Sequence, residues 1–199
     1  MESKEQPLSE AESLALIHKM IYSAKKQFED NGFFYLLWGW LVFISCVSNY
    51  FLLEINYDKP WLAWMILMPA GGVISAVYGR WQGKKQVYKS YLDEVMMYVL
   101  GAFLFSLTFV LVFMQKLGLY TYPMVLVVYG MWLFISGGAM KFNPLIIGGV
   151  INWIIACIAV FVNFETQLIL LAIAVLLGYI IPGYLLRAKF SRENKALTA

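Results

Sequence analysis

Residues 142–164 read FNPLIIGGVINWIIACIAVFVNF, a run without a single Asp, Glu, Lys, Arg or His. Lys141 stands directly before this run and Glu165 directly after it. About 20 apolar residues, each rising about 1.5 Å along a helix, cross the hydrocarbon core of a bilayer. The stretch Phe142–Phe164 therefore predicts a membrane-spanning helix bounded by charge at both ends.

Outward from this run, five further stretches meet the same test, and none of them contains an ionisable residue other than Tyr or Cys. They are Gly32–Leu53, Pro60–Gly79, Val95–Met114, Leu119–Met140 and Thr166–Leu186. The sequence therefore predicts an all-α, polytopic membrane protein with six transmembrane helices. We expect three regions: a cytoplasmic N-terminal segment (1–31), a six-helix transmembrane domain (32–187) and a basic cytoplasmic tail (188–199).

The composition agrees with this class. Of the 199 residues, 61% are hydrophobic and 14% are charged, and the mean hydropathy is +0.70. Soluble domains are only about 45–50% apolar, even with Gly included. Between Val95 and Leu186 the charged residues are Lys116, Lys141 and Glu165. An aqueous surface cannot be built from so few charges, whereas a lipid-facing surface can.

The distribution of Lys and Arg predicts the orientation, because cytoplasmic loops carry the excess of both. With a cytoplasmic N-terminus, only Lys59 and Lys116 of the 15 Lys and Arg residues fall outside. We therefore expect a multi-pass protein of the inner membrane with both termini in the cytoplasm. The net charge of +3 is then a topology signal, and no nucleic-acid partner is needed to explain it.

An amphipathic helix is expected before the first span. Ser9 and Glu12 have the spacing of a capping box. Apolar residues recur at helical spacing from Leu14 to Phe28, and Lys25 and Lys26 lie on the other side. Such a helix lies on the inner leaflet, with its lysines toward anionic lipid headgroups, or it docks a cytoplasmic protein partner or a second copy of the chain. Both readings stay open.

A short internal repeat is visible at an offset of 77 residues. GGVIS at 71–75 returns as GGVIN at 148–152, and Leu100-Gly101 returns as Leu177-Gly178. Two halves of three spans each would be related by inversion, which is a common transporter architecture. The matches are short and drawn from a biased alphabet, so chance competes with a true 3+3 inverted repeat.

The repeat singles out candidate residues for close midplane packing or for a solute path. They are Pro69, Gly71, Gly72, Ser75, Pro144, Gly148, Gly149 and Asn152. Small residues let helix backbones approach closely in lipid, so Gly72→Leu is expected to disrupt folding more than Leu67→Ala. Pro69 and Pro144 are expected to kink their spans, and Pro182 is expected to stop the last one. Asn152 is expected to form an interhelical hydrogen bond.

The sequence contains few of the residues and motifs that catalysis requires. His18 is the only histidine, and neither Cys46 nor Cys157 has metal-ligand spacing. The sequence has no nucleophile elbow and no phosphate-binding loop. We therefore expect no catalytic residues, no metal site, no cofactor and no enzymatic activity. The absence of charged side chains within the runs also counts against proton coupling and ion pumping.

Five short stretches carry a resemblance that spans nearly the whole chain. They are LIHKMI (16–21) with LLWGW (36–40), MPAGGVISA (68–76), and NPLIIGG (143–149) with IIPGY (180–184). They resemble a family of uncharacterised bacterial inner-membrane proteins typical of Bacteroidetes. That resemblance implies a bacterial inner-membrane location and no particular activity. The chain is also similar, in size and glycine spacing only, to the six-span acid-resistance membrane proteins of the HdeD type.

Two function hypotheses follow. In the first, the chain is a non-enzymatic membrane protein that acts through helix packing and through contacts at its cytoplasmic face, made by residues 9–29 and 80–94. In the second, it is a small transporter or channel for a neutral or apolar solute. A packed bundle at the candidate residues favours the first hypothesis, and a polar cavity there favours the second.

Overall fold

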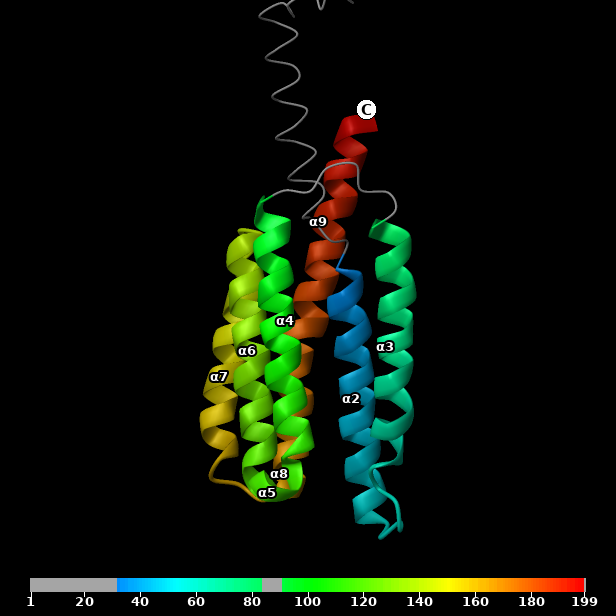
Figure 1. Cartoon of the computed structure of the whole chain (residues 1–199), viewed down its shortest axis with the longest axis vertical. Coiled ribbons are helices and arrows are strands. Elements are labelled where there is room, and N and C mark those ends of the chain that lie inside the picture. Colours follow the sequence, from blue (N-terminus) through cyan, green and yellow to red (C-terminus); the bar gives the residue numbers. More distant parts are fainter. Residues whose placement is uncertain (1–31, 84–90, 199) are drawn as a thin grey trace, which may run out of the picture.

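The computed structural model describes residues 32–83 and 91–198, with side chains as far as residue 192, and every element among them is helical (Figure 1). The predicted amphipathic helix lies outside the described residues. The elements are α2 (Phe33–Glu54), α3 (Leu62–Gly83), α4 (Tyr91–Val112), α5 (Met114–Leu117), η1 (Gly118–Tyr120), α6 (Thr121–Ala139), α7 (Asn143–Ala159), α8 (Phe164–Val175), the π-helical η2 (Leu176–Ile180) and α9 (Ile181–Thr198). The all-α prediction is confirmed for this part of the chain.

Five helical segments among the described residues are long and apolar enough to cross a membrane. They are Phe33–Glu54, Leu62–Trp81, Tyr91–Val112, Met114–Ala139 and Phe164–Arg192. The remaining predicted span corresponds to α7, which has 17 residues and ends at Ala159. It ends before the predicted Phe164 because the chain turns there and Asn163 caps α8, its side chain accepting from the Thr166 backbone N–H at 3.1 Å.

Two helices organise the bundle. Helix α2 packs against α3 on one side and against α8, η2 and α9 on the other. Helix α6 packs against α7, α4 and α8. In Figure 1, α7 and α3 accordingly lie at opposite sides of the bundle. The buried core is shared by α2, α6, α7 and α8, with Cys46, Leu126, Leu133 and Leu171 all nearly or fully buried.

The outer helices α3 and α4 are attached much less firmly. Among the α3 and α4 residues whose exposure the structure describes, only Gly71 and Val110 are buried. The large apolar side chains of these two helices are open, as in Val77, Tyr98 and Phe105, which are 62%, 72% and 74% exposed. Water does not tolerate apolar faces of this extent on a monomer, whereas lipid covers them without cost.

The two prolines of the second half act differently from the prediction. Pro144 lies at the beginning of α7, where no intrahelical hydrogen bond is lost, so the expected kink is wrong. Pro182 is fully buried and stops nothing, since α9 continues to Thr198. Its ring would clash with the carbonyl of Gly178 in a regular helix, and the π turn Leu176–Ile180 directly before it relieves that clash.

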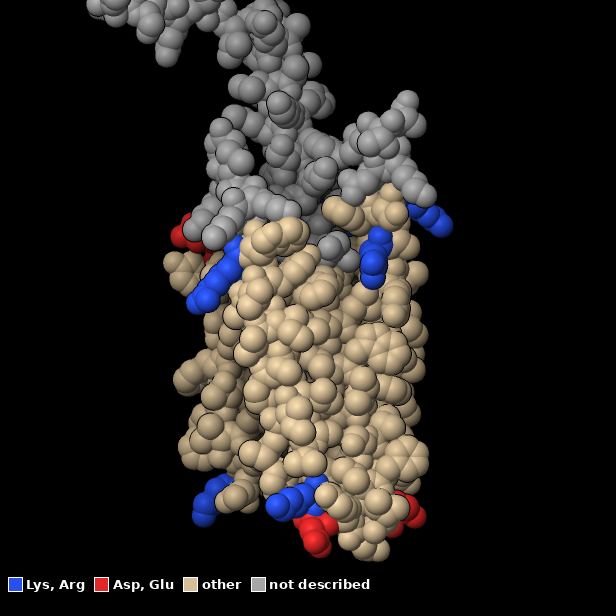
Figure 2. All heavy atoms as spheres, turned by 90° about the vertical axis from the view of Figure 1, so that its right-hand side faces the viewer, with Lys and Arg blue, Asp and Glu red and all other residues tan. Residues whose placement is uncertain are grey.

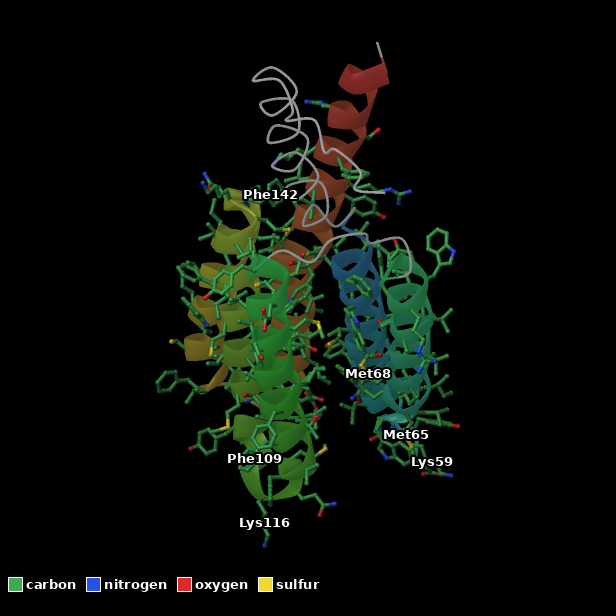
Figure 3. All side chains as sticks on the ribbon, turned by 45° about the horizontal axis from the view of Figure 1, so that its top comes forward. Lys59, Met65, Met68, Phe109, Lys116 and Phe142 are labelled. Atoms are coloured by element: carbon green, nitrogen blue, oxygen red, sulfur yellow. The ribbon has the colours of Figure 1, made fainter. Side chains whose placement is uncertain are left out.

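The surface has three zones. Figure 2 shows Lys, Arg, Asp and Glu gathered at the two ends of the molecule, with an uncharged belt between them. Figure 3 labels Lys59 and Lys116 at one end and Phe142 toward the other, where the ammonium of Lys189 lies 5.7 Å from the Phe142 ring centre. An apolar belt between charged ends is typical of a multi-pass membrane protein.

Candidate functional site

A close helix crossing joins α7 to η2 through two glycines. A methyl group built on Gly148 would lie 2.8 Å from the Cα and 3.0 Å from the carbonyl oxygen of Gly178. No side chain fits between backbones at this separation, because both neighbours are main-chain atoms that cannot move aside. The crossing therefore requires glycine at position 148, and it positions Asn152 one turn further along α7.

Asn152 is fully buried between the two helices. Its amide N–H group donates to the Gly148 carbonyl at 2.8 Å and to the Ala174 carbonyl on α8 at 3.3 Å. The predicted interhelical hydrogen bond of Asn152 is confirmed.

A second glycine crossing joins α7 to α6. A methyl group on Gly149 would lie 2.8 Å from the Gly130 carbonyl oxygen and 2.9 Å from the backbone nitrogen of Phe134. Beside this crossing, the indole N–H of Trp153 donates to the Val127 carbonyl at 3.2 Å. Gly148 and Gly149 thus face two different helices, so α7 is held from both sides.

The first candidate group, on α3, is packed in another way. A methyl group on Gly71 would collide with the side chain of Leu41, and Trp38 lies next to it. The indole N–H of Trp38 donates to the Ser75 hydroxyl at 3.1 Å. Gly71 and Ser75 therefore fit α3 against α2 through side chains, with no backbone-to-backbone crossing.

Gly72 and Pro69 do not take part in this contact. Apart from its own helix neighbours, no heavy atom of the described residues lies within 4 Å of a methyl group built on Gly72. The expectation that Gly72 keeps two helix backbones close is therefore wrong within this chain. Pro69 lies inside α3 and is exposed. The two candidate groups lie on α3 and α7, at opposite sides of the bundle (Figure 1), and are not brought together.

Two features of the crossings were missed at the level of the sequence. Gly130 completes the α6–α7 contact, and its position opposite Gly149 depends on a turn of only three residues, 140–142. Gln167 is fully buried, and its amide donates to the carbonyls of Leu119 and Ala159, both at 2.9 Å. An amide within an apolar run was the available signal for Gln167.

Among the described residues, several buried polar side-chain atoms have no hydrogen-bond partner. The oxygens of the Asn49, Asn152 and Gln167 side-chain amides and the Tyr179 hydroxyl are buried without a hydrogen-bond partner among the described residues. None of these groups is a nucleophile paired with a base. Within the same part of the chain, no three His, Cys, Asp or Glu side chains are grouped for a metal ion.

The fold and the crossings define a class: an all-helical protein with several helices long and apolar enough to span a membrane, held together by glycine contacts and buried amides. Comparison with protein-family models, with curated proteins and with solved structures finds no match to this chain.

Proposed function

We propose that this chain is a six-span protein of the bacterial inner membrane, with both termini in the cytoplasm. The single observation that carries this proposal is the uncharged belt between two charged ends in Figure 2. Helix α7 contains no Lys, Arg, Asp or Glu, and its 17 residues extend about 25 Å. A span somewhat shorter than the hydrocarbon core is accommodated by local thinning of the bilayer.

The charges at the two ends support the orientation. Arg80, Lys141, Arg187, Lys189 and Arg192 belong to the end at which α3 finishes and α9 emerges. The other end carries Lys59 and Lys116 together with three acidic residues, Glu54, Asp58 and Glu165. Retention of basic loops in the cytoplasm would place the first of these ends inside.

Cysteine labelling tests this orientation. In a variant with Cys46→Ser and Cys157→Ser, a membrane-impermeant maleimide added to intact spheroplasts should label Tyr57→Cys and spare Arg192→Cys. Tyr57 is 49% exposed and Arg192 is exposed as well, so access in the folded chain does not decide the result. Labelling of Arg192→Cys alone would invert the topology and remove the basis of the proposal.

Within this frame, the protein works without enzymatic chemistry, through helix packing and contacts at its cytoplasmic face. Helix α9 carries Arg187, Lys189 and Arg192 beyond the apolar belt, and the sequence of segment 9–29, with three lysines and three glutamates, predicts a further amphipathic surface. Each lysine or arginine near an anionic leaflet adds about 1 kcal/mol of attraction. Anionic lipid headgroups are therefore the proposed partners of this face, ahead of a cytoplasmic protein or a second copy of the chain.

A peptide of residues 9–29 separates these partners. It should bind vesicles that contain phosphatidylglycerol, gain helicity there, and bind phosphatidylcholine vesicles weakly. Binding should weaken with salt, since the attraction is screened over about 10 Å at 0.1 M ionic strength. A peptide that stays unfolded on both kinds of vesicle would favour a protein partner, and Ile21→Glu would then be expected to abolish docking in the full chain.

One observation supports the second candidate, a transporter or channel for a neutral or apolar solute. Helix α2 packs against the last span through α8 and η2, while α6 packs against α4. The third helix of each half would thus pack against the first helix of the other half. Such reciprocal packing is compatible with an inverted repeat. Stopped-flow light scattering of proteoliposomes, with glycerol as the probe, should show faster re-swelling than protein-free liposomes if this candidate holds.

A further inference from the structure

The residues at the tight crossing of α7 on η2 have counterparts on α3 and α4 at the offset of 77 residues. Gly148, Asn152 and Gly178 correspond to Gly71, Ser75 and Gly101. In the second half these three residues meet, because a methyl group on Gly178 would collide with Asn152 and one on Gly148 would collide with Gly178.

In the first half the counterparts do not meet. Gly101 has no heavy atom of the described residues within 4 Å of a built methyl group, apart from its own helix neighbours. Gly71 faces α2, and α3 and α4 pack against α2 and α6 rather than against each other. The same small residues at the same spacing thus bring α7 and η2 together in the second half, whereas α3 and α4 stay apart in the first half.

The difference amounts to a turn of one helix about its axis. In the second half, Gly149 faces α6 and Gly148 faces η2. In the first half, Gly71 faces α2, the counterpart of α6, and Gly72 faces open space. Neighbouring residues are about 100° apart around a helix. A rotation of α3 by about this angle would bring Gly72 against α2 and Gly71 toward α4.

We infer that α3 and α4 close against each other in a second conformation, in which Gly71 faces Gly101 and Ser75 lies between the helices as Asn152 does in the second half. In the open state, side-chain contacts hold α3 against α2, and the movement would have to exchange them: Trp38 donates a hydrogen bond to Ser75, Leu41 packs at Gly71, and the ring of Tyr78 stacks on that of Phe33 at 4.0 Å. The ring of Trp64 on α3 lies 6.4 Å from that of Tyr122 on α6. Small residues on both helices permit the close approach in lipid.

Packed interfaces of this kind have discrete arrangements, so open and closed pairs are two states. The inference rests on the repeat that supports the second candidate function. It concerns the chain itself and does not depend on which solute is carried.

Disulfide trapping tests the closure. In the full chain with Cys46→Ser and Cys157→Ser, kept in native membrane vesicles, the pair Ser75→Cys and Gly101→Cys is oxidised with copper phenanthroline. Trapping accumulates a rare state over time, so a small closed population is still detected. We expect this pair to cross-link, and we expect the same of the corresponding pair Asn152→Cys and Gly178→Cys, because these positions are in contact in the closed half.

Three further variants make the result specific. Ser75→Cys with Thr108→Cys, two turns along α4, should stay uncross-linked. Gly72→Leu, which meets nothing in the open state, should reduce cross-linking of the 75–101 pair to that background because its side chain would meet α2. Ala70→Leu should leave cross-linking unchanged, since the counterpart of Ala70 is Ile147, a large residue that is 58% exposed.

Absence of the 75–101 cross-link, while the 152–178 pair cross-links in parallel, would overturn the closure. So would cross-linking that Gly72→Leu leaves intact, or that the 75–108 pair matches, because random motion then explains it. Either result leaves the six-span topology standing, since that is judged by maleimide labelling alone.

Discussion

The two sides of this bundle differ in how firmly similar sequences are held. On one side α7 is clamped between α6 and η2 by glycine crossings at Gly148 and Gly149. On the other side α3 carries the same glycine pair, yet Gly71 touches only side chains and Gly72 touches nothing nearby. A glycine pair in an apolar run is therefore compatible with a tight crossing and with an open face.

What decides between the two outcomes is the surface opposite each glycine. Gly130 and Gly178 present bare backbone to α7, whereas α2 presents Trp38 and Leu41 to α3. In lipid there is no hydrophobic force between helices, so contact depends on shape and on polar groups. Two smooth backbones can approach closely, while an indole keeps the neighbouring helix at the distance of a side chain.

The same substitution on both sides should separate the two kinds of glycine by the largest difference in stability. Gly148→Leu would force apart main-chain atoms that now lie within van der Waals contact, and we expect destabilisation of about 3 kcal/mol or more. Gly72→Leu should change stability by less than about 0.5 kcal/mol, as for an open surface site. Thermal unfolding in detergent, followed by loss of the monodisperse peak, measures both.

The two variants have equal helix propensity and equal added volume, so each serves as control for the other. Equal losses would mean that Gly72 is covered by another molecule in the native protein. Equal tolerance would mean that the α7–η2 crossing relaxes easily and is no firmer than the open face of α3.

Gln167 offers the next largest effect. Gln167→Leu would leave the carbonyls of Leu119 and Ala159 without the donor that now satisfies them inside the bundle. We expect a loss of about 1–3 kcal/mol, the cost of unsatisfied buried groups. The same thermal assay measures it, with Thr166→Val as the neighbouring control. A variant as stable as the control would show that another donor reaches these carbonyls.

The hydrogen bonds of Asn152 and Ser75 can be compared by the loss of stability when each is removed. Asn152→Ala removes the bond to Ala174 and should cost about 1–2 kcal/mol, the upper range for interhelical hydrogen bonds in membranes. Ser75→Ala removes only the bond from Trp38 and should cost about 0.5 kcal/mol. Chemical denaturation in mixed micelles resolves this difference. A larger loss of stability for Ser75→Ala than for Asn152→Ala would mean that α3 is held more firmly than α7.

The smallest effect is expected at Gly101. Gly101→Ala adds a methyl group where nothing stands within 4 Å outside its own helix neighbours, and alanine favours a helix over glycine by about 1 kcal/mol in water. The variant should therefore match the parent or exceed it slightly in thermal stability. The matched substitution Gly178→Ala should destabilise, because Leu133 lies 2.9 Å from the added carbon. Destabilisation at both positions would indicate that α4 is covered.

The sequence by itself determined the helices and their approximate limits. An apolar run of about 20 residues in lipid has only one way to satisfy its backbone, namely within its own helix. For this reason Phe33–Glu54 and Tyr91–Val112 were predicted to within a few residues. The interhelical role of Asn152 followed in the same way, because a buried amide in an apolar run must bond to a neighbouring helix.

Only the tertiary structure decided which glycines touch and what the prolines do. Gly71 and Gly148 stand in the same local sequence, and their different contacts depend on residues such as Trp38 and Gly178 that lie elsewhere in the chain. Likewise, α9 continues past Pro182 because the π turn Leu176–Ile180 comes before it. Contacts between helices depend on the shapes of two surfaces at once, and a single run of sequence specifies only one of them.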